Sequence, residues 1–76
     1  MRELVDYLVG EILSKDNFDI VEVEDGNTVE IRVQVDADKI GKVIGKSGRI
    51  AKAIRTIVKA SAQNSDKHYD VIISER

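Results

Sequence analysis

The chain of 76 residues contains no cysteine, which excludes disulfides and thiolate metal sites. No apolar run approaches the roughly 18 residues that a membrane span requires. Glu3 and Asp6 also lie where a secretory signal would place a basic start and an apolar run. The composition therefore predicts one soluble, cytoplasmic domain over residues 1–76, with no membrane segment.

Aromatic residues are scarce, since the chain has only Tyr7, Phe18 and Tyr69. A surface that stacks several bases on aromatic rings is therefore improbable. If the chain binds a nucleic acid, the affinity must come from other contacts.

Acidic residues are absent from one stretch, residues 39–59, although the whole chain has 14 of them and a net charge of -2. Seven of the twelve basic residues lie in this stretch: Lys39, Lys42, Lys46, Arg49, Lys52, Arg55 and Lys59. Such segregation indicates an anionic partner on one face, of which nucleic acid is the common case. Charge alone leaves a second interpretation open, that of a solvated helix face.

Apolar periodicity predicts an α+β domain whose elements follow the order α-β-β-α-α-β. The strand at 28–36 is the clearest, because Val29, Ile31, Val33 and Val35 alternate strictly with polar residues. A turn at 25–27 makes it the second arm of a hairpin, whose buried face the helices must cover. The expected ranges are a helix at 2–14, strands at 18–24 and 28–36, a short helix ending near 44, a helix at 49–64 and a strand at 69–74.

Three finer expectations follow from the same patterns. Val21 and Val23 alternate with glutamates in the first strand, although Phe18 and Ile20 blur its register. Either Asp36 or Asp38 can cap the short helix. The core face of the long helix is expected to carry Ile50, Ile54, Ile57 and Val58.

The two helices of the basic stretch are separated by a four-residue loop, Gly45-Lys46-Ser47-Gly48. Glycines allow positive φ angles and the close approach of a ligand, and the amides that open the following helix favour an anion. Lys46 and Arg49 would be unfavourable at a helix N-terminus unless an anion lies between them. Gly41, one turn earlier, either opens the helix surface to a sugar-phosphate backbone or packs closely against a strand.

A nucleotide-triphosphate loop is excluded by spacing. That motif requires four residues between its glycines, and Gly41 and Gly45 enclose only three, including the apolar Val43 and Ile44.

The segment Val43-Ile44-Gly45-Lys46-Ser47-Gly48 resembles the V/I-I-G-x-x-G signature of the K-homology (KH) RNA-binding domain. The element order resembles the type II KH arrangement, and the whole chain is similar to the small, single-domain bacterial KhpA (YlqC) family. The resemblance implies a three-stranded mixed sheet with three helices packed on one face. One departure from the KH pattern is Ala51, where a large aliphatic residue is common.

The resemblance also implies an RNA-binding site in which the glycine loop meets the phosphates and aliphatic side chains lie beside the bases. The last strand near residues 71–73 would form the opposite wall. The predicted RNA-binding residues are Ile40, Gly41, Lys42, Val43, Ile44, Gly45, Lys46, Ser47, Gly48, Arg49 and Lys52.

The function implied is binding of single-stranded RNA, or single-stranded DNA, with low to modest sequence specificity. The chain would act as a post-transcriptional regulator or RNA chaperone together with a KH partner. The alternative is a protein assembly subunit, either a homodimer or a heterodimer with a larger Jag/EloR-type (KhpB) KH protein, in which RNA binding is secondary.

No enzyme, catalytic residue, metal site or cofactor is predicted. His68 is the only histidine and has no partner at metal-ligand spacing, and Ser47 lacks both the G-x-S-x-G context and a placeable base.

Overall fold

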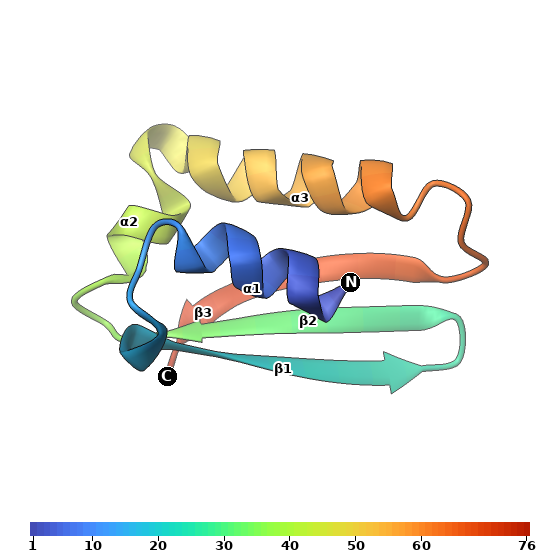
Figure 1. Cartoon of the computed structure of the whole chain (residues 1–76), viewed down its shortest axis with the longest axis horizontal. Coiled ribbons are helices and arrows are strands. Elements are labelled where there is room, and N and C mark those ends of the chain that lie inside the picture. Colours follow the sequence, from blue (N-terminus) through green and yellow to red (C-terminus); the bar gives the residue numbers. More distant parts are fainter.

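The computed structural model describes all 76 residues and has three helices on one face of a three-stranded sheet (Figure 1). The predicted order and the mixed sheet are therefore confirmed. In chain order the elements are α1 (Arg2–Gly10), a 3₁₀ turn (Lys15–Asn17), β1 (Phe18–Asp25), β2 (Thr28–Val35), α2 (Ile40–Ile44), a 3₁₀ turn (Lys46–Gly48), α3 (Arg49–Ser61) and β3 (His68–Glu75).

The sheet has the strand order β1-β2-β3, with β2 in the centre. β1 pairs with β2 as an antiparallel hairpin, while β3 runs parallel to β2. Parallel neighbours require a long crossover connection, and α2 and α3 supply it. The glycine loop therefore lies within the crossover, at one end of the helical layer.

The core is built from apolar side chains of the helices and of all three strands. The strict alternation of β2 is confirmed, because its four predicted apolar residues are all buried against the helices. The buried core residues are Val5, Val9, Leu13, Phe18, Ile20, Val29, Ile31, Val33, Val35, Val43, Ala51, Ile54, Val58 and Val71.

The core face of α3 differs from the expectation at one position. Ile57 is 40% exposed, whereas Ala51 is 4% exposed and occupies the core face beside Ile54 and Val58. At about 100° per residue, Ala51 lies closer to the direction of Ile54 and Val58 than Ile57 does. Helical geometry thus favoured a small residue over a large one.

The structure resolves the register of β1, which the sequence left blurred. Phe18 and Ile20 are buried, while Val21 is 40% exposed on the open side of the sheet. The reason is the register, which pairs Phe18 with Val35 and Ile20 with Val33.

Two helix ends differ from the expected ranges, and α2 lacks the expected cap. α1 ends at Gly10, four residues before the expected end, although the Leu13 amide still donates to the Val9 carbonyl at 2.9 Å. α3 ends at Ser61, three residues early. α2 has no side-chain cap, because the Asp36 carboxylate accepts hydrogen bonds from Arg76 and Asn17, and Asp38 is exposed.

The longest helix, α3, has 13 residues, and no helix combines the length and apolarity needed to cross a bilayer.

Candidate nucleic-acid interface

The loop between α2 and α3 has positive φ angles at three of its four residues. Gly45 has φ 75° and ψ 174°, Ser47 has φ 58° and Gly48 has φ 74°. Left-handed angles are accessible to glycine and are uncommon for other residues. The backbone at Gly45 and Gly48 is therefore not covered by side chains of its own, while Lys46 and Arg49 extend from the same turn.

The three glycines of the predicted site have different surroundings. A Cβ on Gly45 would lie 2.7 Å from Cγ1 of Ile50, so the loop and the first turn of α3 pack against each other there. A Cβ on Gly41 or Gly48 would meet nothing within 4 Å. Close packing against a strand is therefore excluded as the reason for Gly41, which leaves the surface of α2 open at this point.

The basic residues around the loop have no ionic partners. None of the seven cations between Lys39 and Lys59 forms a salt bridge. Of the five basic residues elsewhere, all but Arg2 are paired with carboxylates. The fold thus pairs four of its five other cations and leaves this set free to meet an external anion.

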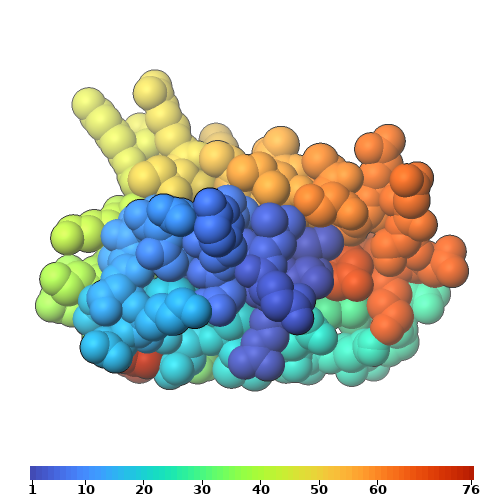
Figure 2. Space-filling view, in the orientation of Figure 1, coloured from blue at the N-terminus to red at the C-terminus, as the bar shows by residue number.

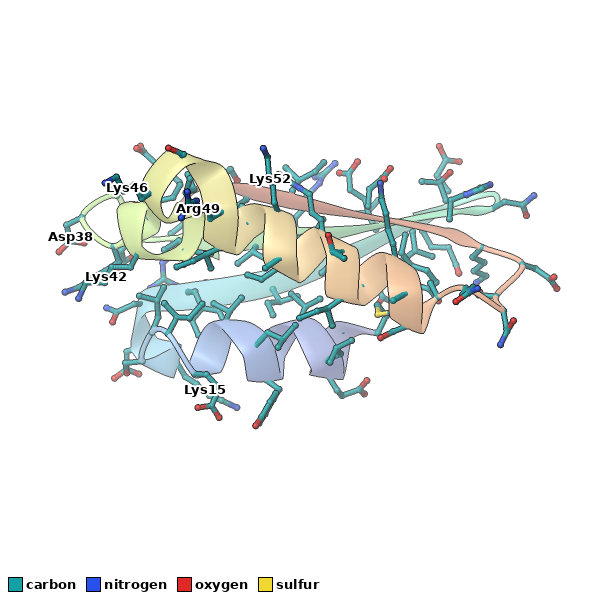
Figure 3. The ribbon with its side chains drawn as sticks, turned by 90° about the horizontal axis from the view of Figure 1, so that it is seen from above. Lys15, Asp38, Lys42, Lys46, Arg49 and Lys52 are labelled. Atoms are coloured by element: carbon teal, nitrogen blue, oxygen red, sulfur yellow. The ribbon has the colours of Figure 1, made fainter.

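Three of the free cations, Lys42, Lys46 and Arg49, lie at the loop end of the molecule (Figure 3), and Lys52 lies further along α3. In Figure 2, two side chains coloured as the loop region stand out from one end of the molecular surface. The region is exposed, since Lys42, Lys46, Ser47, Arg49 and Lys52 are all solvent-accessible.

Among the aliphatic side chains expected to lie beside the bases, Val43 differs from the expectation. This side chain is fully buried in the core, so it supports the neighbouring residues from beneath and has no surface to offer a base. Ile44 is 38% exposed and Ile40 is half-buried against the core, so these two present the aliphatic surface beside the open Gly41.

Ala51, the departure from the KH pattern, is a core residue at 4% exposure. The larger neighbouring side chain, Ile50, is half-buried and packs beside Gly45. The small Ala51 and the larger Ile50 therefore affect the packing under the loop rather than the exposed aliphatic surface of Ile40 and Ile44.

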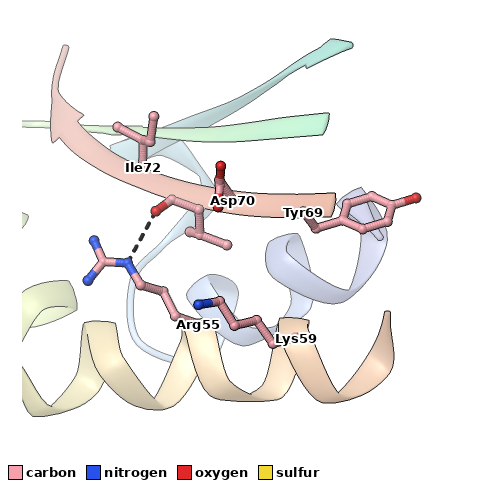
Figure 4. A pocket seen from close by; sticks show the side chains of 6 residues that line it. Arg55, Lys59, Tyr69, Asp70 and Ile72 are labelled. Carbon is pink, nitrogen blue, oxygen red and sulfur yellow. Dashed lines mark hydrogen bonds between the residues drawn. The ribbon is translucent and has the colours of Figure 1, made fainter. Parts of the chain in front are cut away.

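A pocket of about 230 Å³ lies between α3 and the edge strand β3, the strand expected to form the opposite wall near residues 71–73, and its helix-side residues were not assigned from the sequence. Arg55 and Lys59 line it from the helix, and Tyr69, Val71 and Ile72 from the strand (Figure 4). The signal in the sequence was the spacing of Lys52, Arg55 and Lys59, which places them on one side of a helix.

No group of three or more His, Asp or Glu side chains converges in a way that could hold a metal ion. Ser47 and His68 are both exposed and belong to separate parts of the fold, the loop and the start of β3.

Comparison with known proteins identifies relatives of the chain by sequence. The family described as "KhpA/KhpB, KH domain" matches residues 2–73. The RNA-binding protein KhpA of Aquifex aeolicus (strain VF5) is 38% identical over 76 residues, which cover 99% of this chain and 96% of that protein. The RNA-binding protein KhpA of Caldanaerobacter subterraneus subsp. tengcongensis is 43% identical over 76 residues, covering 96% and 99%, and that of Clostridium perfringens is 41% identical over 68 residues, covering 88% and 91%. No solved structure matches the chain.

Proposed function

Because the chain belongs to the KhpA/KhpB family of KH domains, we propose that it binds single-stranded RNA through the Gly45–Gly48 loop. The relatives named above are RNA-binding proteins, which supports the proposal. The observation that carries it is the set of unpaired cations around the loop. The loop has positive φ angles and leads directly into the 13-residue helix α3.

The loop would hold the sugar-phosphate backbone of about four nucleotides, as KH loops do. Lys42, Lys46 and Arg49 supply positive charge, and the first amides of α3 add partial positive charge directed at the phosphates. The bases would then lie along Gly41 and the aliphatic surface of Ile40 and Ile44. Phosphate contacts fix where the RNA strand lies but do not read its bases, so discrimination between bases should be modest.

The test is the double variant Lys46→Asp with Ser47→Asp. Aspartate tolerates the left-handed angles of position 47 better than most residues, so the fold should be retained. We expect affinity for a fluorescent single-stranded RNA to fall by at least about tenfold, because two negative charges replace one phosphate-binding cation. Fluorescence anisotropy measures the affinity, and circular dichroism checks the fold.

A matched control is Arg2→Asp with Ser65→Asp, which makes the same change in net charge at two exposed positions away from the loop. The control should bind RNA nearly as the native chain does. If both double variants lose equal affinity, net charge rather than the loop explains binding, and the proposal fails. The same titration with DNA of equivalent sequence measures the contribution of the 2′-hydroxyl groups.

A second function, assembly with another KH chain, is favoured by an exposed apolar strip on α3. Ala53, Ile57 and Ala60 recur at helical spacing and are all exposed, and Ile57 retains 40% of its surface. Small residues flanking a branched one allow a second element to approach closely. We propose that this strip contacts a second copy of the chain or a larger KhpB-type partner, with which the chain would act as a post-transcriptional regulator or RNA chaperone.

Replacement of Ile57 by Asp tests the assembly. The native chain should sediment as a dimer at micromolar concentration, or as a heterodimer when mixed with the partner, and the variant as a monomer. A native chain that remains monomeric both alone and with the partner would exclude this function.

A further inference from the structure

The first strand, β1, lies at the margin of the sheet and has one neighbour, β2 (Figure 1). The Asp36 amide donates to the Asn17 carbonyl at 3.0 Å, where the ladder between the two strands begins. Along an antiparallel ladder, the backbone groups of one residue face the neighbouring strand and those of the next residue face away from it. The residues whose N–H and C=O groups face away from β2 are therefore Phe18, Ile20, Glu22 and Glu24. None of these groups has a hydrogen bond to a turn or loop.

The two margins of the sheet differ in how far they are covered. At β3, the Arg55 Nε donates to the Val71 carbonyl at 3.2 Å, so a side chain of α3 occupies part of that edge. The backbone of β1 receives no such hydrogen bond, and its eight residues pair with β2 in a continuous register. A regular, unpaired edge is a template for another strand. β1 is therefore the side at which this sheet can be extended.

The charge of β1 selects the strand that could be added. Its sequence has four carboxylates and no basic residue, and the carboxylates belong to Asp19, Glu22, Glu24 and Asp25. Arg76 and Lys67 pair with two of them, whereas Glu22 and Asp25 have no ionic partner. A second copy of β1 would bring four more carboxylates to the edge without a cation, and like charges across a strand pair are destabilising. A strand with basic side chains is complementary.

The two faces of β1 offer different surfaces beside this edge. On the open side of the sheet, Val21 is 40% exposed and Val23 is half-buried, so an aliphatic side chain can pack there. On the helix side, Glu22 and Glu24 are exposed over the second half of the strand. A pocket of about 180 Å³ lies on the first half, between α1 and β1, and is lined by Arg2, Asp6, Lys15, Phe18, Asp19 and Ile20. Because this lining has charges of both signs, it suits a polar, uncharged side chain.

We propose that the outer edge of β1 binds an extended segment of a partner protein, in which basic and aliphatic residues alternate, as an added antiparallel strand. Antiparallel pairing is slightly more stable per residue than parallel pairing. Basic side chains lie opposite Glu22 and Glu24, and aliphatic side chains pack beside Val21 and Val23. Main-chain hydrogen bonds supply the affinity, and the alternate side chains supply the specificity. This site is on the opposite margin of the sheet from β3 and does not depend on the proposed function.

The probe is the peptide Lys-Val-Lys-Val-Thr-Val-Thr, acetylated and amidated, whose lysines fall opposite Glu24 and Glu22. Isothermal titration calorimetry measures its affinity for the native chain, and NMR amide shifts should concentrate in β1. The charge-reversed peptide Glu-Val-Glu-Val-Thr-Val-Thr should bind at least about tenfold more weakly, because two ion pairs become two repulsions.

Two N-methylated peptides test whether the backbone pairs. In the antiparallel register the lysine amides face β1 and the valine amides face solvent. Methylation of the two lysine amides should weaken binding by at least about tenfold, because two main-chain hydrogen bonds are lost. Methylation of the first two valine amides should change the affinity by less than about twofold.

Two variants of the chain make the matched test on the protein. Glu22→Pro removes an N–H that faces solvent, a place where an edge strand tolerates proline, and it also removes the charge. Glu22→Gln removes the charge alone. We expect Glu22→Pro to weaken peptide binding by at least about tenfold and Glu22→Gln by about threefold. Circular dichroism checks that both variants fold, and the methylated peptides test the same backbone groups on the native chain.

Equal affinities of the two methylated peptides, or of the two Glu22 variants, would mean that charge alone attracts the peptide and would overturn strand addition. A probe that does not bind at millimolar concentration would overturn it as well. If Glu22→Pro changes the sedimentation of the chain without peptide, the edge belongs to a second copy instead, and the proposal fails.

Discussion

At Gly45 the backbone has φ 75° and ψ 174°, a region of conformational space that is close to exclusive to glycine. The position is also crowded, because a Cβ there would lie 2.7 Å from a side-chain carbon of Ile50. Backbone strain and steric overlap act in the same direction. Gly45 is thus required by the fold before any ligand is considered.

We expect Gly45→Ala to lower the free energy of unfolding by about 1–3 kcal/mol. In a domain of this size each kcal/mol lowers Tm by about 4–8 °C, so thermal denaturation followed by circular dichroism should detect the change. An unchanged Tm would mean that the loop relaxes freely and that its angles are not set by the fold.

At Gly41 the same substitution should have the opposite effect on stability. It lies inside α2 with open space around its Cα, so Gly41→Ala should stabilise the chain by about 0.5–1 kcal/mol through helix propensity. The added methyl group would enter the surface proposed to face the RNA. We therefore expect Tm to rise and RNA affinity to fall in the same variant, and a parallel rise of both would remove Gly41 from the proposed site.

At the level of elements, Arg76 ties together three segments that are distant in sequence. Its side chain donates to Asp36 after β2 at 2.7 Å, to Asp19 in β1 at 2.6 Å and to the carbonyl of Asp16 in the 3₁₀ turn at 2.6 Å. Asn17 donates to the same Asp36 carboxylate at 3.2 Å. This cluster fixes the connection that leads into α2.

The cluster makes stability depend on pH through Asp36. Hydrogen bonds from Arg76, and then from Asn17, lower the pKa of Asp36 below its ordinary value of 3.8. A lowered pKa in the folded state means that the ionised carboxylate stabilises the fold above the ordinary value and that this contribution is lost as the pH falls below it.

We therefore expect Asp36→Asn to lower Tm at pH 5 to 7, and the difference from the native chain to shrink as the pH falls below about 4. The control is Asp66→Asn, an exposed aspartate with no hydrogen bond or ion pair from its side chain. A Tm difference for Asp36→Asn that is constant with pH would show that the substitution acts through shape rather than through charge.

These elements also mark what the sequence could and could not predict. The alternation of β2 and the glycine loop were visible because each is encoded locally. The buried face of β1 and the missing cap of α2 were not, because each depends on a distant partner: the β2 register and the capture of Asp36 by Arg76. The wall near residues 71–73 was expected only from the family resemblance, and its partners Arg55 and Lys59 on α3 were not expected, since β3 meets α3 only in the folded chain.

Across the whole molecule, ion pairing in the fold, as well as position in the sequence, determines which positive charges are available to a ligand. Lys15 is paired with Asp6 at 3.4 Å near α1, while Lys42 is unpaired near the loop, and Figure 3 shows the two well separated. A single-stranded nucleic acid releases counterions only where it meets unpaired cations, and each neutralised phosphate contributes a log–log salt slope of about 0.7. Equal net charges can therefore have unequal effects on binding.

For U4, an oligouridylate of four nucleotides, we expect the log–log dependence of affinity on salt to have a slope of about 2 in the native chain, because a four-nucleotide strand has about three internal phosphates. Lys42→Gln should reduce the slope by about 0.7, while Lys15→Gln, with the same change in net charge, should leave it unchanged. Fluorescence anisotropy at several salt concentrations gives the slopes. Equal slopes for the two variants would mean that net charge alone governs binding, and would contradict a binding face confined to the loop and α3.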